Sequence, residues 1–470
     1  MTRKPNIIWI MADDLSWGDL GCYGQKLIAT PNIDRLAAEG MRFISCYSGS
    51  TVCAPSRSCL MQGLHTGHAS VRDNMVAFDG GMYRPCLMPE DVTVAQVLRG
   101  AGYKCGLFGK WGLSVPGQPG LPNDKGFDEF FGYLNQRHAH SYYPPFLYHN
   151  RERVNLPDNV GHNHLAPNEY DREGRIIPNG CAGPNPQYAF DLYAARSLDF
   201  VRRYAGEPFF LYLAYTIPHG VHEVPELGIY KDRPWPLVHR VFAAMVTRMD
   251  TAVGELVSLL QELGIDENTL IFFASDNGYS LSGAASNPSL DEVFNHRGPF
   301  KGDKGGLDQG GVRVPAIAWW PGRIPSGVVS DQIWAFWDFL PTAAEVAGAE
   351  VPLNCDGISI LPTLLGERFR QPQRDYLYWE FGNQQAARIG PWWTCRRRPS
   401  DAVQVYDADA DPQQEHDLAA EKPEIVRRAE RIFREAHVPN PQSPSPGETY
   451  DQWSARRERA GLVLENNVDW

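Results

Sequence analysis

The sequence predicts an α/β fold in which helices sandwich a large mixed, mostly parallel β-sheet, with a smaller α+β domain at the C-terminal end. Three observations lead to this prediction. Short apolar segments rich in β-branched and aromatic residues alternate with segments whose apolar residues recur every three or four positions. Near-continuous apolar strands are typical of parallel sheets that are covered on both faces. After about residue 365 the pattern changes to short strands followed by one helix.

The expected elements of the large domain follow this alternation. The first strand is expected at 6–11, where nearly every residue is apolar. The longest helix is expected at about 240–263, because its apolar residues recur at helical spacing and Gly264 can end it. The remaining predicted strands are 104–108, 208–215, 269–274 and 312–320, and the remaining predicted helices are 93–100 and 188–204.

Two further regions complete the expected organisation. Residues 112–186 and 279–311 are rich in small and polar residues and are expected to be long loops over one face of the sheet. The large α/β domain is expected to span 1–365 and the C-terminal domain 366–470. Within the C-terminal domain, strands are predicted at 376–381, 386–389 and 404–406, a helix at 424–436 and a surface tail from Pro439.

The composition places the chain among globular proteins and limits what it can bind. Of its 470 residues, 43% are hydrophobic and 21% are charged, which excludes a disordered or fibrous protein. The net charge of −12 argues against general binding to nucleic acid or to an anionic membrane, since both need clustered Lys and Arg. The nine cysteines are irregularly spaced and form neither a disulfide framework nor a zinc motif.

Segment lengths bear on the location of the protein. Nowhere does the sequence contain an apolar stretch as long as a transmembrane helix, and the apolar run at 7–12 is too short for a signal peptide. The expected location is the cytoplasm, or the periplasm or cell exterior if a leader has been removed. The oligomeric state is left open.

Acidic residues follow two of the predicted strands. Asp13 and Asp14 come after the first strand, and Asp276 and Asn277 come after the strand at 269–274. Ligands of open α/β sheets bind beyond the carboxyl ends of strands, so these side chains could converge there. Such a cluster would repel itself without a cation and would suit Ca²⁺ or Mg²⁺. Each pair by itself is more often a turn, and only the two strand ends together favour a metal site.

A second candidate is Cys53, in the segment Cys-Ala-Pro-Ser-Arg. It lies in a polar run ahead of an expected helix N-terminus, where the helix dipole and Arg57 favour an anion. A lone cysteine is commonly a small buried apolar residue. From the residues alone, a reactive Cys53 and a buried one both stay open.

With this segment the chain resembles the type I, formylglycine-dependent sulfatases of the alkaline-phosphatase-like superfamily, which carry Cys-x-Pro-Ser-Arg. Further segments resemble motifs of the same family in the same order along most of the chain. They are 6–14, 30–37, 106–113, 215–219, 276–278, 302–315 and 405–418. The resemblance implies a sulfuric ester hydrolase, acting on a small carbohydrate or aryl sulfate, with its catalytic domain at 1–365.

The resemblance also implies a cation site and a modified residue. Asp13, Asp14, Asp276 and Asn277, together with modified Cys53, would ligate one divalent cation, typically Ca²⁺, with Mg²⁺ also possible. A separate maturation enzyme would oxidise Cys53 to formylglycine. One hydroxyl of the hydrated aldehyde attacks sulfur and releases the alcohol. The other hydroxyl then loses its proton, so that sulfate leaves and the aldehyde returns.

The remaining catalytic roles come from the same resemblance. Arg57 would hold the formylglycine, and Lys110 and Lys304 would bind the sulfate oxygens. His219 would contact the ester oxygen and protonate the leaving group. Dication, Lys and Arg together suit a substrate that carries one negative charge.

The chain departs from the family at the usual base of the elimination step, a His of the Gly-Lys-Trp-His-Leu motif. Gly112 stands there. His138 and His140, in the predicted loop after 131–133, could each supply the missing imidazole, since the pKa of a His suits proton transfer near neutral pH. Loop histidines are also commonly structural, and the sequence does not choose between these two.

Other departures and neighbours complete the expected site. Gln62 stands where the family usually has Thr, and Gln309 where it has Glu. His222 and Glu223 could line the substrate pocket, whereas His65 and His68 are expected to be structural. Aromatic residues of the long loops could stack on a sugar face or form a plain hydrophobic pocket: Trp111, Tyr142, Tyr143, Phe146 and Tyr148.

Two other functions compete with the sulfatase hypothesis. One is a phosphonate or phosphate ester hydrolase of the same superfamily. The other is a degenerate family member that binds sulfated ligands without turnover, which Gly112 and Gln62 suggest. The intact Cys53–Arg57 segment and the complete set of expected metal ligands argue against the second.

Overall fold

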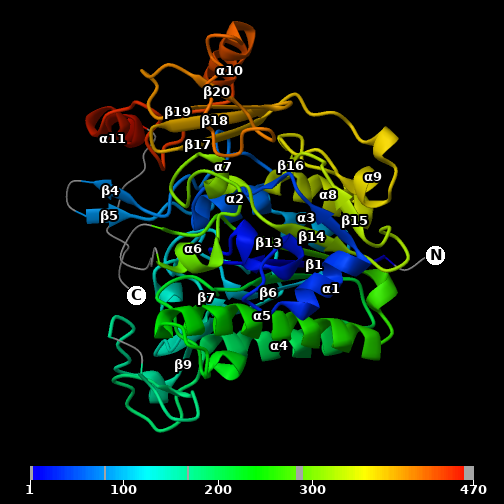
Figure 1. The fold of residues 1–470 in the computed structure, drawn as a ribbon, viewed down its shortest axis with the longest axis vertical. Coiled ribbons are helices and arrows are strands. Elements are labelled where there is room, and N and C mark those ends of the chain that lie inside the picture. The colour runs from blue at the N-terminus through cyan, green and yellow to red at the C-terminus, as the bar shows by residue number, and fades with distance from the viewer. Residues whose placement is uncertain (1–3, 79–80, 167–168, 282–288, 460–470) are drawn as a thin grey trace.

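The computed structural model describes residues 4–78, 81–166, 169–281 and 289–459. A ten-stranded sheet forms the centre of the large domain, in the order β15-β2-β14-β13-β1-β12-β6-β7-β8-β9 (Figure 1). The central run from β13 to β7 is parallel, and antiparallel pairs join β14, β8 and β9 to it. The strands are β1 (Asn6–Ala12), β2 (Met41–Phe43), β6 (Lys104–Lys110), β7 (Glu129–Tyr133), β8 (Phe146–His149), β9 (Glu152–Asn155), β12 (Phe209–Ala214), β13 (Thr269–Ser275), β14 (Ala316–Trp319) and β15 (Val328–Ser330).

Helices cover both faces of this sheet. On one face α1 (Pro31–Glu39), α4 (Ala189–Tyr204) and α5 (Leu237–Glu262) share a hydrophobic core with the sheet. On the other face, the helices in the core are α2 (Cys53–Gln62), α3 (Val94–Gly100) and α8 (Phe339–Ala347). Figure 1 shows α4 and α5 side by side beneath the sheet. The shorter helices are α6 (Ser289–Phe294), α7 (Gln309–Val312) and α9 (Leu361–Leu364).

The first strand shows why its residues are apolar without alternation. Ile8, Ile10 and Ala12 of β1 belong to the core beneath α4 and α5, whereas Ile7, Trp9 and Met11 belong to the core beneath α2 and α8. Successive side chains of a strand point to opposite faces, so a strand between two helical layers has no solvent-facing side. Every residue of β1 is buried accordingly.

A four-stranded antiparallel sheet forms the small C-terminal domain, in the order β17-β18-β19-β20. Its elements are β17 (Leu377–Phe381), β18 (Gln384–Ile389), β19 (Trp392–Arg396), β20 (Gln404–Asp407) and α10 (Pro423–Glu435). Trp379 and Trp393 pack with Tyr47 and Trp337 of the large domain. The side-chain amide of Gln384 contacts the loop after Lys304, with Nε2 donating to the Gly305 carbonyl at 2.9 Å. The two domains are therefore in contact through packed aromatic rings and through a hydrogen bond.

These observations confirm the expected fold class, and several elements differ in detail. The expected loop region 112–186 contains β7, β8 and β9, which extend the central sheet, as well as the short pair β10 (Glu169–Tyr170) and β11 (Ile176–Ile177). The strand expected at 312–320 is shorter, because α7 ends at Val312. Two more short pairs join β3 (Cys46–Tyr47) to β16 (Trp334–Ala335) and β4 (Val76–Phe78) to β5 (Gly81–Tyr83). The domain boundary at 365/366 stays a prediction.

The stretch expected to be a surface tail differs from that expectation. Gln442 is buried, and its amide bonds to the Cys86 backbone and to the Tyr83 hydroxyl. Further along, α11 (Tyr450–Arg459) buries the whole side chain of Trp453. Residues 439–459 therefore pack on the large domain as well as on each other. None of the described helices combines the length and the apolar character that crossing a membrane requires.

Candidate active site

Two neighbouring strands end in the acidic residues that the sequence singled out. β1 and β13 run parallel and in register to their last residues, so Asp13 and Asp14 come to lie beside Asp276 and Asn277. The Asp14 backbone N–H donates to Asp276 Oδ1 at 3.2 Å, and Asn277 Nδ2 donates to Asp14 Oδ1 at 2.7 Å. All four side chains are buried. The structure thus brings together the four expected metal ligands.

Cys53 is the first residue of α2 and faces this cluster. Its thiol donates to Asp13 Oδ1 at 3.4 Å, and Lys304 Nζ lies 3.4 Å from Sγ. One turn later, Arg57 directs Nε and Nη2 to Asp276 Oδ2 at 3.0 and 2.8 Å. Burial, followed by the charge of Asp13, raises the pKa of the Cys53 thiol to about 12. The unmodified residue is therefore a neutral thiol and a poor nucleophile.

Two lysines neutralise the carboxylates. Lys110, at the end of β6, donates from Nζ to Asp13 Oδ2 at 2.6 Å, and Lys304 donates from Nζ to Asp14 Oδ1 at 2.5 Å. Burial alone would raise the pKa of Asp13, but the surrounding cations, Lys110 first, hold it well below its usual range. Burial and the charge of Asp13 raise the pKa of Asp276 to about 6. The cluster therefore depends on positive charge to stay ionised.

The donor set suits a hard divalent cation. Ligand atoms of Asp13, Asp14, Cys53 and His219 lie within 4.8 Å of one another. Asn277 Oδ1 is buried and has no hydrogen-bond partner within the described part of the chain. Carboxylate and amide oxygens are the ligands that Ca²⁺ and Mg²⁺ prefer, and the Asn277 side chain lies beside Asp14, which its amide nitrogen contacts. The residues present therefore fit the expected cation.

A second group of potential ligands is explained by hydrogen bonds. His65, His68 and Asp356 also place ligand atoms within 4.8 Å of one another. His68 Nδ1 lies 2.9 Å from Asp356 Oδ1, and the Gly67 backbone N–H donates to His65 Nδ1 at 3.2 Å. That N–H can donate only to an unprotonated Nδ1, so the neutral His65 ring carries its proton on Nε2. Neither ring nitrogen then has a free lone pair with which to bind a cation. These hydrogen bonds account for both rings, and the structural role expected for His65 and His68 stays a prediction.

Of the two candidate bases, His140 lies at the site. Its ring stacks on the ring of His219 with centroids 4.2 Å apart and planes 20° apart. His219 Nδ1 contacts the Gly220 carbonyl, and its Nε2 lies 3.5 Å from Asp14 Oδ2. Burial, followed by the charges of His219 and the two site lysines, holds the pKa of His140 well below its usual value. The ring is therefore neutral and able to accept a proton.

His138 lies in a different environment. Its ring packs against Phe146 with centroids 4.4 Å apart and meets Tyr133 edge-on at 5.2 Å. Burial, together with Arg153, lowers its pKa to about 4. Both histidines belong to one short 3-10 turn, His138–His140. That turn places His138 among aromatic rings and His140 against His219.

Sequence reasoning did not select Gln136 as a site residue. A Cβ atom built on Gly112 would lie 2.6 Å from Gln136 Oε1 and 4.0 Å from Lys110 Cε, so this amide lies over Gly112 close to Lys110. The signal that could have found it is its place after β7, the strand next to β6. That is the rule by which the aspartates were found.

The other expected residues separate into two sets. His222 is buried against Phe242 and is close enough to Asp14 for that charge to influence its pKa, which burial lowers to about 4. Glu223 lies away from this group, with Oε1 placed 2.9 Å from His162 Nε2. His222 is therefore near the carboxylates, and Glu223 is engaged in a buried pair.

The two glutamines that replace family residues have structural partners. Gln62 Oε1 accepts from the Ser58 hydroxyl at 2.8 Å and from the Ser70 backbone N–H at 3.0 Å. Gln309 Nε2 donates to the Ala408 carbonyl at 2.8 Å. Neither departure removes a group from the carboxylate cluster.

The aromatic residues expected to stack on a sugar are mostly core residues. Trp111, Tyr142, Tyr143 and Phe146 are all at least 95% buried, which corrects that expectation. Trp111, Tyr142 and Tyr143 belong to the two hydrophobic cores that flank the sheet, whereas Phe146 packs against the rings of His138 and Tyr148. The spacing of aromatic residues in a loop-like sequence does not distinguish a stacking platform from a core.

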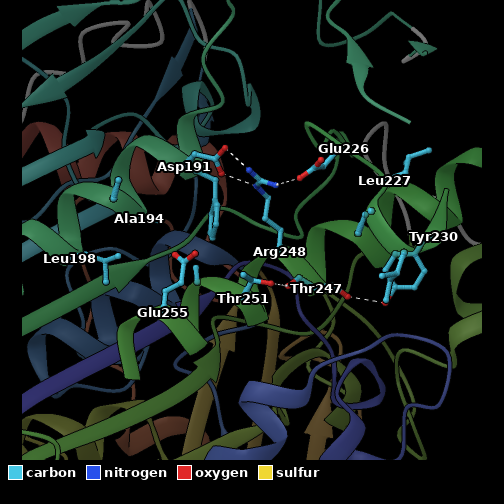
Figure 2. Close-up of a pocket in the computed structure, with 16 residues that line it drawn as sticks. Asp191, Ala194, Leu198, Glu226, Leu227, Tyr230, Thr247, Arg248, Thr251 and Glu255 are labelled. Atoms are coloured by element: carbon cyan, nitrogen blue, oxygen red, sulfur yellow. Dashed lines mark hydrogen bonds and ion pairs between the residues drawn. The ribbon is translucent and has the colours of Figure 1, made fainter. Parts of the chain in front are cut away.

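A cavity of about 530 Å³ lies between α4 and α5, apart from these residues (Figure 2). Arg248 points into it and is held by Asp191 through two hydrogen bonds of 2.7 and 2.6 Å, with Glu226 3.7 Å away. Its lining contains none of the residues of the acidic cluster. The cavity is therefore no part of the candidate active site.

Comparison with known families agrees with this geometry. A family model described as sulfatase matches residues 5–349, and one described as the C-terminal part of N-sulphoglucosamine sulphohydrolase matches residues 302–428. N-acetylgalactosamine-6-sulfatase of Canis lupus familiaris is 35% identical over 412 residues, which cover 83% of this chain and 72% of the relative. Arylsulfatase A of Homo sapiens is 34% identical over 390 residues, covering 78% and 69%.

Solved structures share the fold. Ps i-CgsB in complex with k-i-k-neocarrahexaose is 26% identical, with a TM-score of 0.73 and 97% of each chain covered. Phosphonate monoester hydrolase of Agrobacterium radiobacter is 19% identical, with a TM-score of 0.63, 92% of this chain and 95% of that chain being covered. At that identity the second likeness concerns the fold alone.

Proposed function

The chain belongs to the sulfatase family and is a sulfuric ester hydrolase, and from this premise we propose that it desulfates a sulfated sugar with a formylglycine made from Cys53. The observation that carries the proposal is the position of Cys53. It begins α2 with Sγ 3.4 Å from both Asp13 and Lys304, at the edge of the sheet where carboxylates and cations meet. A residue modified at this atom would face the metal ligands and the sulfate-binding lysines together.

Four side chains would hold one divalent cation beside residue 53: Asp13, Asp14, Asp276 and Asn277. The buried, unpartnered Asn277 Oδ1 supports this assignment among the described residues. When bound, the cation neutralises the carboxylates and polarises oxygen atoms on residue 53 and on the sulfate. Lys110 and Lys304, which bond to Asp13 and Asp14 here, would then be available to bind sulfate oxygens. Ca²⁺ is the ion that the family resemblance favours.

The proton transfers are assigned to two stacked histidines. In the first half-reaction the hydrated formylglycine would supply the hydroxyl that displaces the alcohol from sulfur, and the proton that this hydroxyl loses would be balanced by the proton that His219 gives to the departing alcohol. In the second, His140 would accept the proton of the other hydroxyl, so that sulfate could leave and the aldehyde could return. His140 is proposed over His138 because its ring lies 4.2 Å from that of His219. It takes the role of the histidine missing at Gly112.

The substrate class is argued from the relatives. One is named N-acetylgalactosamine-6-sulfatase, and one solved structure is a complex with k-i-k-neocarrahexaose. We therefore propose a sulfated carbohydrate, with an aryl sulfate as the second candidate. Turnover of a sulfate ester and of a phosphonate ester with the same leaving group tests this choice. Faster cleavage of the phosphonate ester would overturn it in favour of the other hydrolase class.

The first test is mass spectrometry of the tryptic peptide 43–57. The protein is produced together with a formylglycine-generating maturation enzyme, and residue 53 is expected to have exchanged its thiol for an aldehyde. Cys59, which belongs to the same helix but falls in the next tryptic peptide, serves as the internal control and remains a cysteine. If residue 53 also remains a cysteine, the proposed mechanism cannot operate.

A further inference from the structure

The replacement of the family histidine by Gly112 leaves space, and another side chain fills it. Gly112 has a φ of +73°, a left-handed conformation that favours glycine. A methyl group here would lie 2.6 Å from Gln136 Oε1, well inside van der Waals contact. Gln136 and any side chain at position 112 therefore compete for the same volume.

The Gln136 side chain is buried without a bonding partner. The residue is 5% exposed, and neither Oε1 nor Nε2 finds a hydrogen-bond partner among the residues that the structure describes. Leaving a buried amide unpaired costs free energy, because the group gives up its hydrogen bonds to water without replacing them. A buried polar group without a partner calls for an explanation, such as a catalytic role or a bound water molecule or ion. His140 Nε2, four residues away, is unpartnered in the same sense.

The surroundings of the amide indicate which ligand it meets. It lies beside the Lys110 side chain across Gly112, and Lys110 is a proposed sulfate-binding residue. We propose that the Gln136 amide donates a hydrogen bond from Nε2 to an oxygen of the substrate sulfate group, and that Gly112 is small in order to admit it. This inference rests on the proposed function, because it assumes that Lys110 binds sulfate.

The chemistry favours an amide at this position. A neutral donor adds a hydrogen bond to the sulfate without adding charge to a site that already holds Lys110, Lys304 and Arg57. A carboxylate of the same shape would repel the anionic ester. A methionine has a similar length but donates no hydrogen bond. These two replacements separate the hydrogen bond from the packing of the side chain.

The experiment compares Gln136→Met and Gln136→Glu with the wild type. Steady-state hydrolysis of para-nitrophenyl sulfate gives kcat/KM, and inhibition by inorganic sulfate gives Ki. Gln118→Met is the matched control, because the Gln118 amide donates to the Arg84 carbonyl at 3.0 Å and accepts from the Val115 N–H at 3.2 Å. Both variants of Gln136 are expected to raise Ki at least tenfold, Glu more than Met, whereas Gln118→Met changes it less than twofold.

A double-mutant cycle keeps the proposal testable if one variant fails to fold. Gly112→Ala is expected to raise Ki at least fivefold by displacing the amide, and to change it little further in a Gln136→Ala background. The strain of a left-handed alanine is the same in both backgrounds, so the difference isolates the contact with Gln136. Equal effects of Gly112→Ala in the two backgrounds would overturn the coupling.

The outcomes distinguish this inference from the proposed function. If wild type is active and Gln136→Met keeps its Ki within twofold, the inference is wrong and the sulfatase mechanism stands. If residue 53 remains a cysteine and turnover is absent, the mechanism fails, and calorimetric binding of inorganic sulfate decides the inference alone. Loss of sulfate binding in Gln136→Met would then support it, and retention would overturn it.

Discussion

Replacing His140 by alanine is expected to stop the catalytic cycle after its first half. The ring of His140 stacks on His219 at 4.2 Å, which places the two proposed proton-transfer groups side by side. His219 can still protonate the leaving alcohol in the variant, but the second hydroxyl of residue 53 has lost its base. Loss of a general base lowers rates by roughly 10²–10⁴-fold, equivalent to about 3–5 kcal/mol of transition-state stabilisation.

A burst assay separates this effect from general damage. Rapid mixing of the matured variant with para-nitrophenyl sulfate should release one equivalent of alcohol per active site at a nearly normal rate, followed by a slow steady state. Mass spectrometry of the peptide 43–57 should then show sulfate attached to residue 53. The control is His138→Ala, since the His138 ring packs on Phe146 and Tyr133. That variant should lose about 1–3 kcal/mol of stability and keep its kcat.

The pH dependence adds a further check. Burial lowers the pKa of His140, so the neutral ring, which is the form that accepts a proton, persists below the ordinary histidine pKa of about 6.5. Protonation of this group should therefore not reduce kcat between about pH 7.5 and 6.5. Full steady-state activity of His140→Ala would refute the assignment of the base. So would a loss of activity without a burst, because the first half-reaction would then be affected.

The remaining predictions concern the cation, the modified residue and a buried ion pair. Asp276→Ala should lose the bound cation, measured by elemental analysis, and reduce kcat by at least about 10²-fold; a variant that retains both metal and rate would contradict the ligand assignment. Cys53→Ser should release at most one equivalent of alcohol and accumulate a stable sulfate ester, which mass spectrometry detects as added mass on the peptide 43–57. Continued turnover of this variant would show that a second hydroxyl is not needed. Arg72→Met should lower the free energy of unfolding by about 1.5–3 kcal/mol, because the buried Glu380 loses its 2.9 Å ion pair with Arg72 and keeps only His437 and Tyr378 as side-chain partners. Arg202→Met, which removes an exposed pair, should change it by less than about 1 kcal/mol in the same denaturation assay, and equal effects would show that burial does not matter here.

The strand-end rule accounts for how much of the site the sequence could predict. Asp13 and Asp276 are far apart in the chain, yet each directly follows a recognisable apolar strand, and parallel strands place such residues at one edge. The strands β7, β8 and β9 escaped prediction because they are only four or five residues long and lie in a region rich in glycine, proline and polar residues. Gln136 was missed for the same reason, since it follows β7, which the sequence analysis did not recognise as a strand.

The choice between His138 and His140 shows a second limit. Both lie in one 3-10 turn, and residue spacing alone does not say which side chain of such a turn faces the site. Tertiary contacts decide, with Phe146 receiving one ring and His219 the other. The packing of residues 439–459 could not be predicted for another reason. Gln442 attaches the segment through hydrogen bonds to the Cys86 backbone, and such bonds leave no hydrophobic pattern in the sequence.

The contact between Gln384 and the loop after Lys304 limits how the C-terminal domain of this enzyme can be truncated or exchanged. Gln384 begins β18 of the small domain, and its amide both donates to the Gly305 carbonyl and accepts from the Leu307 N–H at 3.2 Å. Because the small domain thereby holds the lysine loop in place, a truncated chain that ends before β17 would retain the metal ligands but lose the support of Lys304. Chimeras that exchange C-terminal domains between sulfatases therefore need to carry this glutamine, or its equivalent, together with the loop that it supports.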